Sequence, residues 1–159
     1  MTVLVVRHGL SEANNRANVG TAAFGAADAP LMVLGHQQAR AVGVRLRDRY
    51  GLAPDIEVAV STMLRTQQTA RSAGFIRQTV HPALDEVRLT DLAETRRAID
   101  AEELPEAARA AAARVLERPP AQRVWFTHGL LIAALCAALD LPSASRFIPR
   151  FCEIRELPL

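Results

Sequence analysis

Short apolar segments alternate along this chain with longer segments of helical spacing, and this alternation restricts the folds that the chain can adopt. The first apolar segment, TVLVV at 2–6, is rich in β-branched residues, which is typical of a strand buried on both faces. Similar segments predict four further strands, at 55–60, 77–81, 123–127 and 151–157. Helices are predicted at 34–50, 61–73, 86–117 and 129–139. Strands that alternate with helices predict an α/β fold, a three-layer α/β/α sandwich with a largely parallel central sheet.

Glycines and small polar residues mark the ends of these elements. Gly51 and Gly74 are predicted to close the helices that precede them, and Ser61 is predicted to cap the N-terminus of the helix that follows it. The segment 9–30 is rich in Gly, Ala and Asn and has no clear period, so we expect a long loop there. Long loops in compact domains tend to be functional or mobile.

The composition is that of an ordinary globular protein. A length of 159 residues, half of them hydrophobic, predicts a single domain over 1–159 with a sizeable core. The formal net charge is only +2, and the 19 basic residues, all arginines, form no long block, so we expect no nucleic-acid partner. We also expect no membrane partner, because the longest apolar stretch, 129–139, is too short to span a bilayer.

The two cysteines and the opening residues bear on location. Cys136 lies in an apolar helical segment and is expected in the core, whereas Cys152 is expected in a strand. Two cysteines do not make a disulfide scaffold, and the opening residues lack a signal-peptide core, so we expect a cytoplasmic protein. The sequence carries no signal for an oligomeric state.

Three predicted strands lead into polar residues that are capable of chemistry. The residues that follow these strands are Arg7 and His8, then Ser61 and Arg65, and finally His128. In open α/β sheets, ligands bind beyond the carboxyl ends of the strands. We therefore expect these side chains to converge, although they lie far apart in the sequence.

Together with Asn14 and Glu86, these residues have the chemistry to handle a phosphoryl group. Arginines and an amide donate hydrogen bonds to a tetrahedral oxyanion. A neutral histidine is a nucleophile toward phosphorus, and the cations beside His8 should oppose its protonation. A carboxyl group such as that of Glu86 can protonate a leaving alcohol and then activate water. This scheme requires no metal ion or other cofactor, and the four histidines lack the spacing of a metal site.

The motifs that carry these residues resemble those of the histidine phosphatase superfamily, the phosphoglycerate mutase-like group. The similar segments are RHGLSEAN at 7–14, APLMVLGHQQA at 29–39, STMLRTQQTA at 61–70, LDE at 84–86 and FTHGLLI at 126–132. Their order and rough spacing agree with the family over residues 2–135. One short motif would be weak evidence, whereas five in the right order are specific.

The resemblance implies a phosphoglycerate mutase-like fold and a role for each matching residue. His8 would be the nucleophile that becomes phosphorylated, and Glu86 would be the proton donor. His128 would complete the catalytic set and would hold the phosphoryl group together with Arg7 and Arg65. Asn14 and the backbone N–H of Gly129 would assist them. The implied activity is that of a metal-independent phosphatase, which hydrolyses a small phosphorylated substrate, or a phosphoprotein, through a phosphohistidine.

Two departures from the family pattern bear on this expectation. Met32 stands where the family often has threonine, so a side-chain cap of the following helix is lost or moved. The interval from Glu86 to His128 is much shorter than in the true mutases, whose long insertion covers the substrate. We therefore expect hydrolysis, with Asp85 and Asp91 as rival candidates for the acid.

Three other functions stay open at this point. A phosphoglycerate mutase-type phosphotransferase would need its phosphoenzyme protected from water. A protein-phosphohistidine phosphatase would depend less on an acid, because imidazole leaves more easily than an alkoxide. A non-catalytic module would bind a phosphorylated ligand without turnover. In each case we expect residues 15–30 and 87–120 to set specificity.

Overall fold

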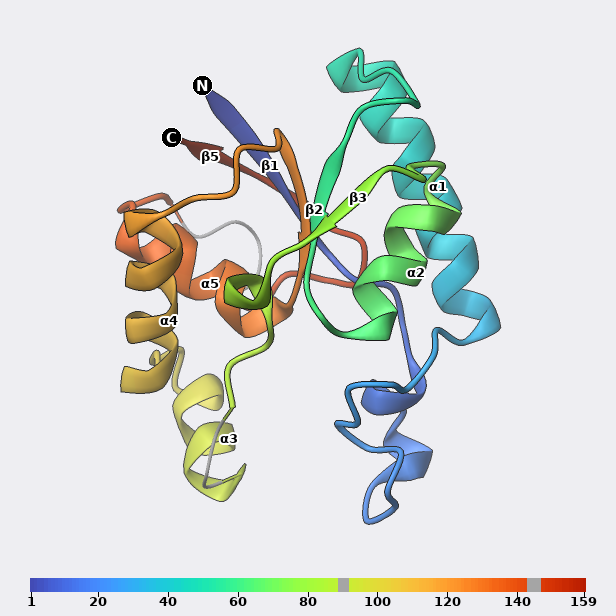
Figure 1. The fold of residues 1–159 in the computed structure, drawn as a ribbon. Coiled ribbons are helices and arrows are strands. Elements are labelled where there is room, and N and C mark those ends of the chain that lie inside the picture. The colour runs from blue at the N-terminus through green and yellow to red at the C-terminus, as the bar shows by residue number, and fades with distance from the viewer. Residues whose placement is uncertain (89–91, 143–146) are drawn as a thin grey trace.

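Five strands form one central sheet in the order β3-β2-β4-β1-β5 in a computed structural model that describes residues 1–88, 92–142 and 147–159 (Figure 1). The strands are β1 (Thr2–Arg7), β2 (Val58–Val60), β3 (Gln78–Val80), β4 (Val124–Thr127) and β5 (Ile154–Pro158). The strands β3, β2, β4 and β1 run parallel, and only β5 is antiparallel to its neighbour β1. The predicted largely parallel sheet is therefore confirmed.

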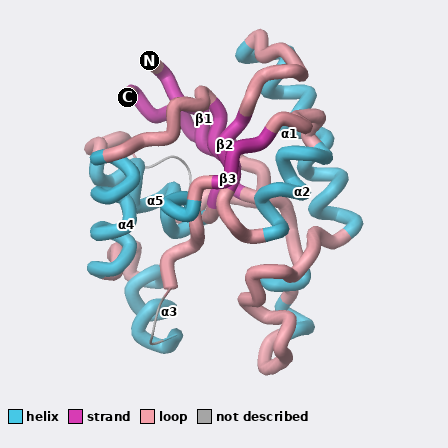
Figure 2. Tube along the Cα trace, viewed as in Figure 1, coloured by secondary structure: helices cyan, strands magenta, loops and turns pink. Residues whose placement is uncertain are grey.

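Helices cover both faces of the sheet. The α-helices are α1 (Val33–Tyr50), α2 (Leu64–Ser72), α3 (Leu92–Asp100), α4 (Glu106–Glu117) and α5 (Gly129–Ala138). Three short 3-10 helices are η1 (Glu12–Asn14), η2 (Arg16–Asn18) and η3 (Pro82–Leu84). Helices α1 and α2 lie on one face and α4 and α5 on the other, which gives the three predicted layers (Figures 1 and 2). None of the helices in the described ranges has both the length and the apolar character needed to cross a bilayer.

Alternation along β1 explains why its sequence is apolar throughout. Val3 and Val5 pack in a cluster with residues of α4 and α5, whereas Leu4 and Val6 pack in a cluster with residues of α1 and α2. Successive side chains of a strand point to opposite faces, so a strand covered on both sides needs apolar residues at every position. Each such buried side chain contributes about 1.5–3 kcal/mol to folding. The strand thus ends firmly held at the point where the polar residues begin.

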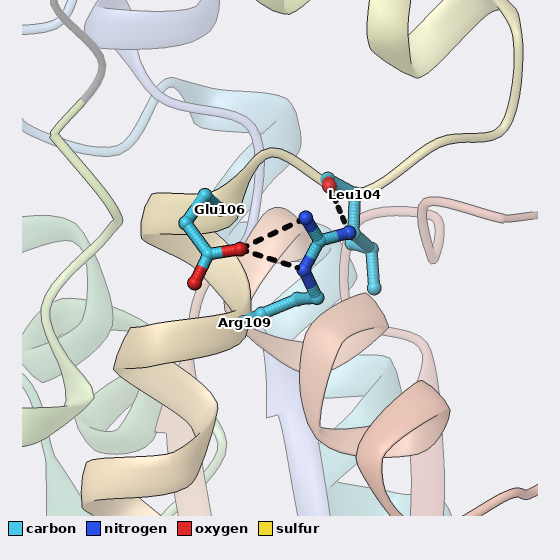
Figure 3. A network of polar contacts seen from close by, with 3 residues as sticks. All are labelled: Leu104, Glu106 and Arg109. Carbon is cyan, nitrogen blue, oxygen red and sulfur yellow. Dashed lines mark hydrogen bonds and ion pairs between the residues drawn. The ribbon is translucent and has the colours of Figure 1, made fainter.

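The helix α4 begins at a local polar network that is drawn in Figure 3. The Arg109 guanidinium donates to Glu106 Oε2 from Nε and Nη2, at 3.1 and 2.9 Å, and from Nη1 to the carbonyl oxygen of Leu104, at 2.9 Å. The pair is mostly exposed, so it contributes less than about 1 kcal/mol. The hydrogen bond to Leu104 connects the residues just before α4 to the first turn of that helix.

Several local predictions are confirmed and others are wrong. Gly51 closes α1 with φ of 63° and donates to the carbonyl of Arg47, as predicted. Ser61 does not cap α2, because the N-cap position is Met63 and the Ser61 hydroxyl lies in a buried side-chain network instead. Cys152 does not lie in a strand, because a left-handed turn with φ of 56° at this residue precedes β5. The segment predicted as largely helical forms two helices, with residues 86–88 outside them.

Two glycines bring the loop after β1 into contact with the start of α1. A Cβ atom on Gly35 would lie 2.0 Å from the carbonyl oxygen of Leu10, and one on Gly9 would lie 2.5 Å from the carbonyl oxygen of Gly35. Real Cβ atoms do not approach a backbone oxygen so closely, so neither position accepts a side chain without movement of the backbone. The loop that carries Arg7, His8 and Gly9 is thereby held against α1.

We expect Gly35→Ala to destabilise the protein by about 1–3 kcal/mol, because the clash outweighs a gain of about 1 kcal/mol in helix propensity. The measurement is chemical denaturation followed by circular dichroism. Gln37→Ala, an exposed change on the same helix, should alter stability by less than about 0.5 kcal/mol. Equal stability of the two variants would contradict the close contact.

Candidate functional site

The carboxyl ends of three adjacent parallel strands bring the predicted polar residues together. Arg7 at the end of β1 pairs in register with Thr127 at the end of β4, and the backbone N–H of His8 donates to the Thr127 carbonyl at 3.0 Å. His8 and His128 therefore leave the sheet side by side, and their ring centroids lie 5.1 Å apart. Ser61 follows β2, the neighbour of β4 on its other side.

The contacts of Arg7 and His8 continue the alternation of β1. Arg7 follows Val3 and Val5 and lies beside the first residue of α5, where a Cβ atom on Gly129 would be 3.1 Å from its Nε. His8 follows Leu4 and Val6 and contacts Arg65 of α2. Because consecutive residues point to opposite faces of the sheet, Arg7 lies on the side of α5 and His8 lies on the side of α2.

Both ring nitrogens of His8 are committed to one neutral form. Its Nδ1 lies 2.7 Å from the carbonyl oxygen of Gly9, so Nδ1 carries the proton and donates. Its Nε2 accepts from Nε of Arg65 at 3.3 Å, so this nitrogen presents a lone pair. The Gly9 N–H is held in turn by the hydroxyl of Thr69, at 3.0 Å. The ring is therefore oriented with Nε2 toward the cationic centre of the site.

Electrostatics keep His8 uncharged. Burial, with Arg65 and Arg7 beside the ring, lowers the pKa of His8 well below its ordinary value, because each of these effects disfavours a second proton. The cations act on His8 in the predicted direction, and burial is the larger cause of the lowered pKa. Near neutral pH the Nε2 nitrogen consequently carries no proton, and among the described residues its lone pair accepts only the long hydrogen bond from Arg65.

The two arginines are aimed at the site by backbone carbonyls and an aromatic ring. Arg65 is only 4% exposed and donates from Nη1 to the Ala26 carbonyl at 3.1 Å. Arg7 donates from Nη1 to the Pro149 carbonyl at 2.7 Å, and its guanidinium lies 4.0 Å from the centre of the Phe151 ring. The Nε of Arg7 is buried and has no hydrogen-bond partner among the residues that the structure describes. A buried donor without a partner costs free energy, and a bound anion would satisfy it.

His128 shows the same signature. Its Nε2 lies 2.9 Å from the hydroxyl of Ser61, whereas its Nδ1 is buried and has no partner in the described part of the chain. The ring is completely buried, and burial, then His8 and the two arginines, lower the pKa of His128 well below its ordinary value. The unpartnered Nε of Arg7 lies beside Gly129, which directly follows His128 at the start of α5.

Gly129 leaves space that a side chain would take from Arg7 and Ile148. A Cβ atom there would also lie 3.3 Å from Cζ of Arg7 and 2.8 Å from Cγ2 of Ile148. Its N–H belongs to the first turn of α5, where backbone donors have no acceptor within the helix and the helix dipole favours negative charge. The position therefore combines the room and the donor that an oxyanion needs.

The structure distinguishes the rival acids by their surroundings. Glu86 accepts hydrogen bonds from the N–H groups of Val87 at 3.0 Å and Leu130 at 3.5 Å. Burial raises the pKa of Glu86, while these bonds, Arg7 and Arg65 act against that rise. Asp85 instead accepts from the N–H and hydroxyl of Thr62, at 2.7 and 2.8 Å, before the start of α2. Asp91 lies outside the described residues.

Asn14 lies at the edge of the site rather than in its centre. Its side-chain oxygen accepts from the Ser11 hydroxyl at 2.7 Å, and the residue lines a cleft that also reaches Arg7. The cleft has a volume of about 680 Å³, and its further lining residues are Arg16, Val19, Phe24, Arg96, Ile99, Asp100 and Phe151. These come from the loop after β1, from α3 and from the turn before β5, and the loop and α3 lie at the same end of the sheet (Figure 1).

Sequence reasoning missed some of the groups that build the site. Phe151 and the Pro149 carbonyl hold Arg7, but the sequence indicated only a strand there. Ser61 was expected to cap a helix and to converge with the other residues, but its direct contact with His128 was not predicted. The two other histidines bond elsewhere, His36 to Ser72 and His81 to Gln122. In the part of the chain that is described, no three His, Cys, Asp or Glu side chains gather in a way that could hold a metal ion.

Comparisons with known proteins agree with this arrangement. Residues 3–123 match the family model of the histidine phosphatase superfamily (branch 1). A protein of Thermus thermophilus is 24% identical, with 99% of this chain and 94% of that chain covered and a TM-score of 0.69. A phosphoglycerate mutase of the same organism is 23% identical, with 99% and 93% covered and a TM-score of 0.67. A mycobacterial glucosyl-3-phosphoglycerate phosphatase in complex with VO3 is 23% identical, with 98% and 90% covered and a TM-score of 0.63.

These structural similarities establish the fold, which is phosphoglycerate mutase-like. None of the curated proteins matches the sequence significantly.

The geometry predicts that inorganic phosphate stabilises the folded protein. At a concentration of about 100 times Kd the gain is about 2.7 kcal/mol, or a rise of about 5–10 °C in Tm for a chain of this size. Arg65→Gln should remove most of this rise in a thermal melt, because it deletes a buried cation of the site. Arg71→Gln, on the exposed side of the same helix, should keep it. An equal phosphate response in both variants would place the anion elsewhere.

Proposed function

Since the chain belongs to the histidine phosphatase superfamily, we propose that it is a phosphatase that hydrolyses phosphomonoesters in two steps, through a phosphohistidine on His8. The observation that carries this proposal is the state of the His8 ring. Its Nδ1 proton is given to the Gly9 carbonyl, and its Nε2 lone pair lies among Arg7, Arg65 and His128. This is the form of imidazole that attacks phosphorus.

In the first step, Nε2 of His8 attacks the phosphorus atom and the bond from phosphorus to the ester oxygen breaks. Arg7, Arg65, the Nδ1–H of His128 and the N–H of Gly129 hold the equatorial oxygens, whose charge is spread over the group in the transition state. The Gly9 carbonyl accepts from Nδ1–H of His8 and so stabilises the positive charge that develops on the phosphorylated ring.

Glu86 is the proton donor of this scheme. Its raised pKa keeps a larger fraction protonated than for an ordinary glutamate, and the leaving alkoxide takes that proton. In the second step, Glu86 accepts a proton from water while the water oxygen attacks phosphorus. The bond from phosphorus to Nε2 then breaks, and His8 returns to its neutral form with phosphate as the product.

The alcohol half of the substrate would lie in the cleft next to Arg7 and Asn14. Residues 15–30 and 87–120 were expected to set specificity, and the cleft is lined by residues of the first region and by α3, which lies within the second. Arginines at 16 and 96 and apolar side chains at 19, 24 and 99 line it. It is large enough for a small phosphorylated metabolite.

The segment between Glu86 and His128 favours hydrolysis over transfer of the phosphoryl group to a second acceptor. The described part of that interval contains α3, α4 and β4, and α4 packs against α5 on one face of the sheet. Among the described residues, α3 is thus the one helix of this interval beside the cleft, which the loop after β1 and the turn that carries Phe151 also line. A phosphotransferase needs its phosphoenzyme shielded from water, and these short elements offer little to close over it.

The covalent step predicts an acid-labile phosphoenzyme. Rapid quenching during turnover of a small phosphomonoester should give a protein whose mass has increased by one phosphoryl group, at His8 by peptide mapping. His8→Asn should lose both the adduct and the hydrolysis. His36→Ala, which changes a histidine bonded to Ser72 away from the site, should retain both. An adduct that persists in His8→Asn would refute the assignment.

Glu86→Gln should slow hydrolysis of alkyl phosphates by about 10²–10⁴-fold, whereas aryl phosphates with good leaving groups should be affected far less. The pH profile gives a second readout. An acid that must be protonated loses activity as pH rises through its pKa, so the alkaline limb of kcat/KM reflects the raised pKa of Glu86 and should vanish in the variant. Asp85→Asn should keep the limb and show no such leaving-group dependence. The opposite pattern would assign the acid to Asp85.

A further inference from the structure

Two buried hydroxyl groups, those of Ser61 and Thr66, form a hydrogen-bonded series that ends at His128 and has no role in the proposed reaction. The Ser61 hydroxyl lies 2.9 Å from Nε2 of His128 and 2.9 Å from the hydroxyl of Thr66. All three side chains are completely buried. These hydrogen bonds connect Ser61 in the loop after β2, Thr66 in the first turns of α2, and His128, which directly precedes α5.

The number of donor and acceptor positions on Ser61 allows two directions for the hydrogen bonds that join Thr66, Ser61 and His128. A serine hydroxyl has one donor and two acceptor positions. The backbone N–H of Met63 donates to the Ser61 oxygen at 3.1 Å, which leaves that oxygen one further bond to accept and one to donate. Either Thr66 donates to Ser61 and Ser61 donates to His128, or His128 donates to Ser61 and Ser61 donates to Thr66.

The carbonyl oxygen of Met63 permits both directions. The Thr66 hydroxyl lies 2.9 Å from it, so Thr66 can donate there when it accepts from Ser61. The backbone N–H of Thr66 also donates to this carbonyl, at 3.1 Å. The Met63 carbonyl therefore keeps the Thr66 N–H as a donor when the Thr66 hydroxyl donates to Ser61 instead. The local backbone thus favours neither of the two states.

A bound oxyanion favours one of the two hydrogen-bond directions through the unpartnered Nδ1 of His128. Phosphoryl oxygens of a dianion accept hydrogen bonds and do not donate them, so a nitrogen that faces them must carry a proton. A neutral ring with the proton on Nδ1 has a bare Nε2, which needs a donor. A doubly protonated ring is opposed by Arg7, Arg65 and His8, the charged and titratable groups that lie around it, and by its burial, which lowers the pKa of His128.

We propose that Ser61 is a positioning residue, which donates its hydroxyl proton to Nε2 of His128 and so keeps the Nδ1–H of that ring directed at the bound oxyanion. Thr66 supports this state by donating to Ser61. The inference rests on the proposed function in so far as it requires an oxyanion beside His128. It makes a neutral hydroxyl, rather than a carboxylate, the partner that sets the form of the second histidine.

The direct test is NMR of the whole protein with ¹⁵N-labelled histidine and saturating inorganic phosphate. Long-range ¹H–¹⁵N correlations report which nitrogen of each ring is protonated, and the spectrum of His128→Gln identifies the signals of His128. We expect a proton on Nδ1 and a bare Nε2. A proton on Nε2 alone, or on both nitrogens, would overturn the inference.

Variants give a second readout. Ser61→Ala should lower the affinity for phosphate by about tenfold or more and remove the preference for the Nδ1–H form, because the donor to Nε2 is gone. Ser61→Thr keeps a hydroxyl and should retain both properties, whereas Thr66→Val should weaken them. Ser72→Ala is the matched control, since its hydroxyl contacts His36 in the same kind of pair and lies on the same helix as Thr66. A folded Ser61→Ala protein with the Nδ1–H form and full affinity would also overturn the inference.

The outcomes separate this inference from the proposed function. The expected protonation of His128 without any hydrolysis of phosphomonoesters would refute the function and leave the role of Ser61 intact. Hydrolysis with the other protonation pattern would refute only the role of Ser61. Failure of phosphate to perturb any of the four histidines would refute both.

Discussion

The parallel pairing of β1 with β4 is the constraint on which the rest of the site depends. The register aligns Arg7 with Thr127, and the hydrogen bond from the His8 N–H to the Thr127 carbonyl extends the pairing by one residue. Two histidines that are remote in the sequence therefore emerge together. Because both strands are buried on both faces by helices, a shift of register would turn apolar residues to the wrong cluster, so the pairing is held by the whole core.

Burial and positive charge act together in the resulting site. Arg65 and the two imidazoles are almost completely buried, with the partly buried Arg7 beside them, and no carboxylate among the described residues pairs with either guanidinium at ion-pair distance. Such an arrangement favours neutral histidines, and the pKa values of His8 and His128 are lowered accordingly. It also leaves polar atoms without partners among the described residues, namely Nδ1 of His128 and Nε of Arg7. The same conditions suit a dianionic ligand, which would regain the lost hydrogen bonds in a medium where they are strong.

Much of this arrangement could be predicted from the sequence, because it follows from periodicity and from strand ends. The unbroken apolar segment before Arg7 predicted a strand covered on both faces, and the ends of parallel strands predicted convergence. What could not be predicted depends on contacts between remote segments. The carbonyl and ring that hold Arg7 come from the turn before β5, where Cys152 adopts a left-handed backbone that its type does not indicate. Ser61 has the residue type of a helix cap, and only the position of His128 reveals another partner for it.

The attachment of Arg7 to the turn before β5 links anion binding to the opening of that edge. The Pro149 carbonyl and the Phe151 ring orient the guanidinium, and the backbone N–H of Cys152 donates to the Arg7 carbonyl at 2.9 Å. The strand that follows is the antiparallel edge of the sheet, and edge segments are among the first to open in local unfolding. By thermodynamic reciprocity, any fluctuation that frees this edge weakens the hold on an anion. A bound anion slows hydrogen exchange along the edge by the same factor.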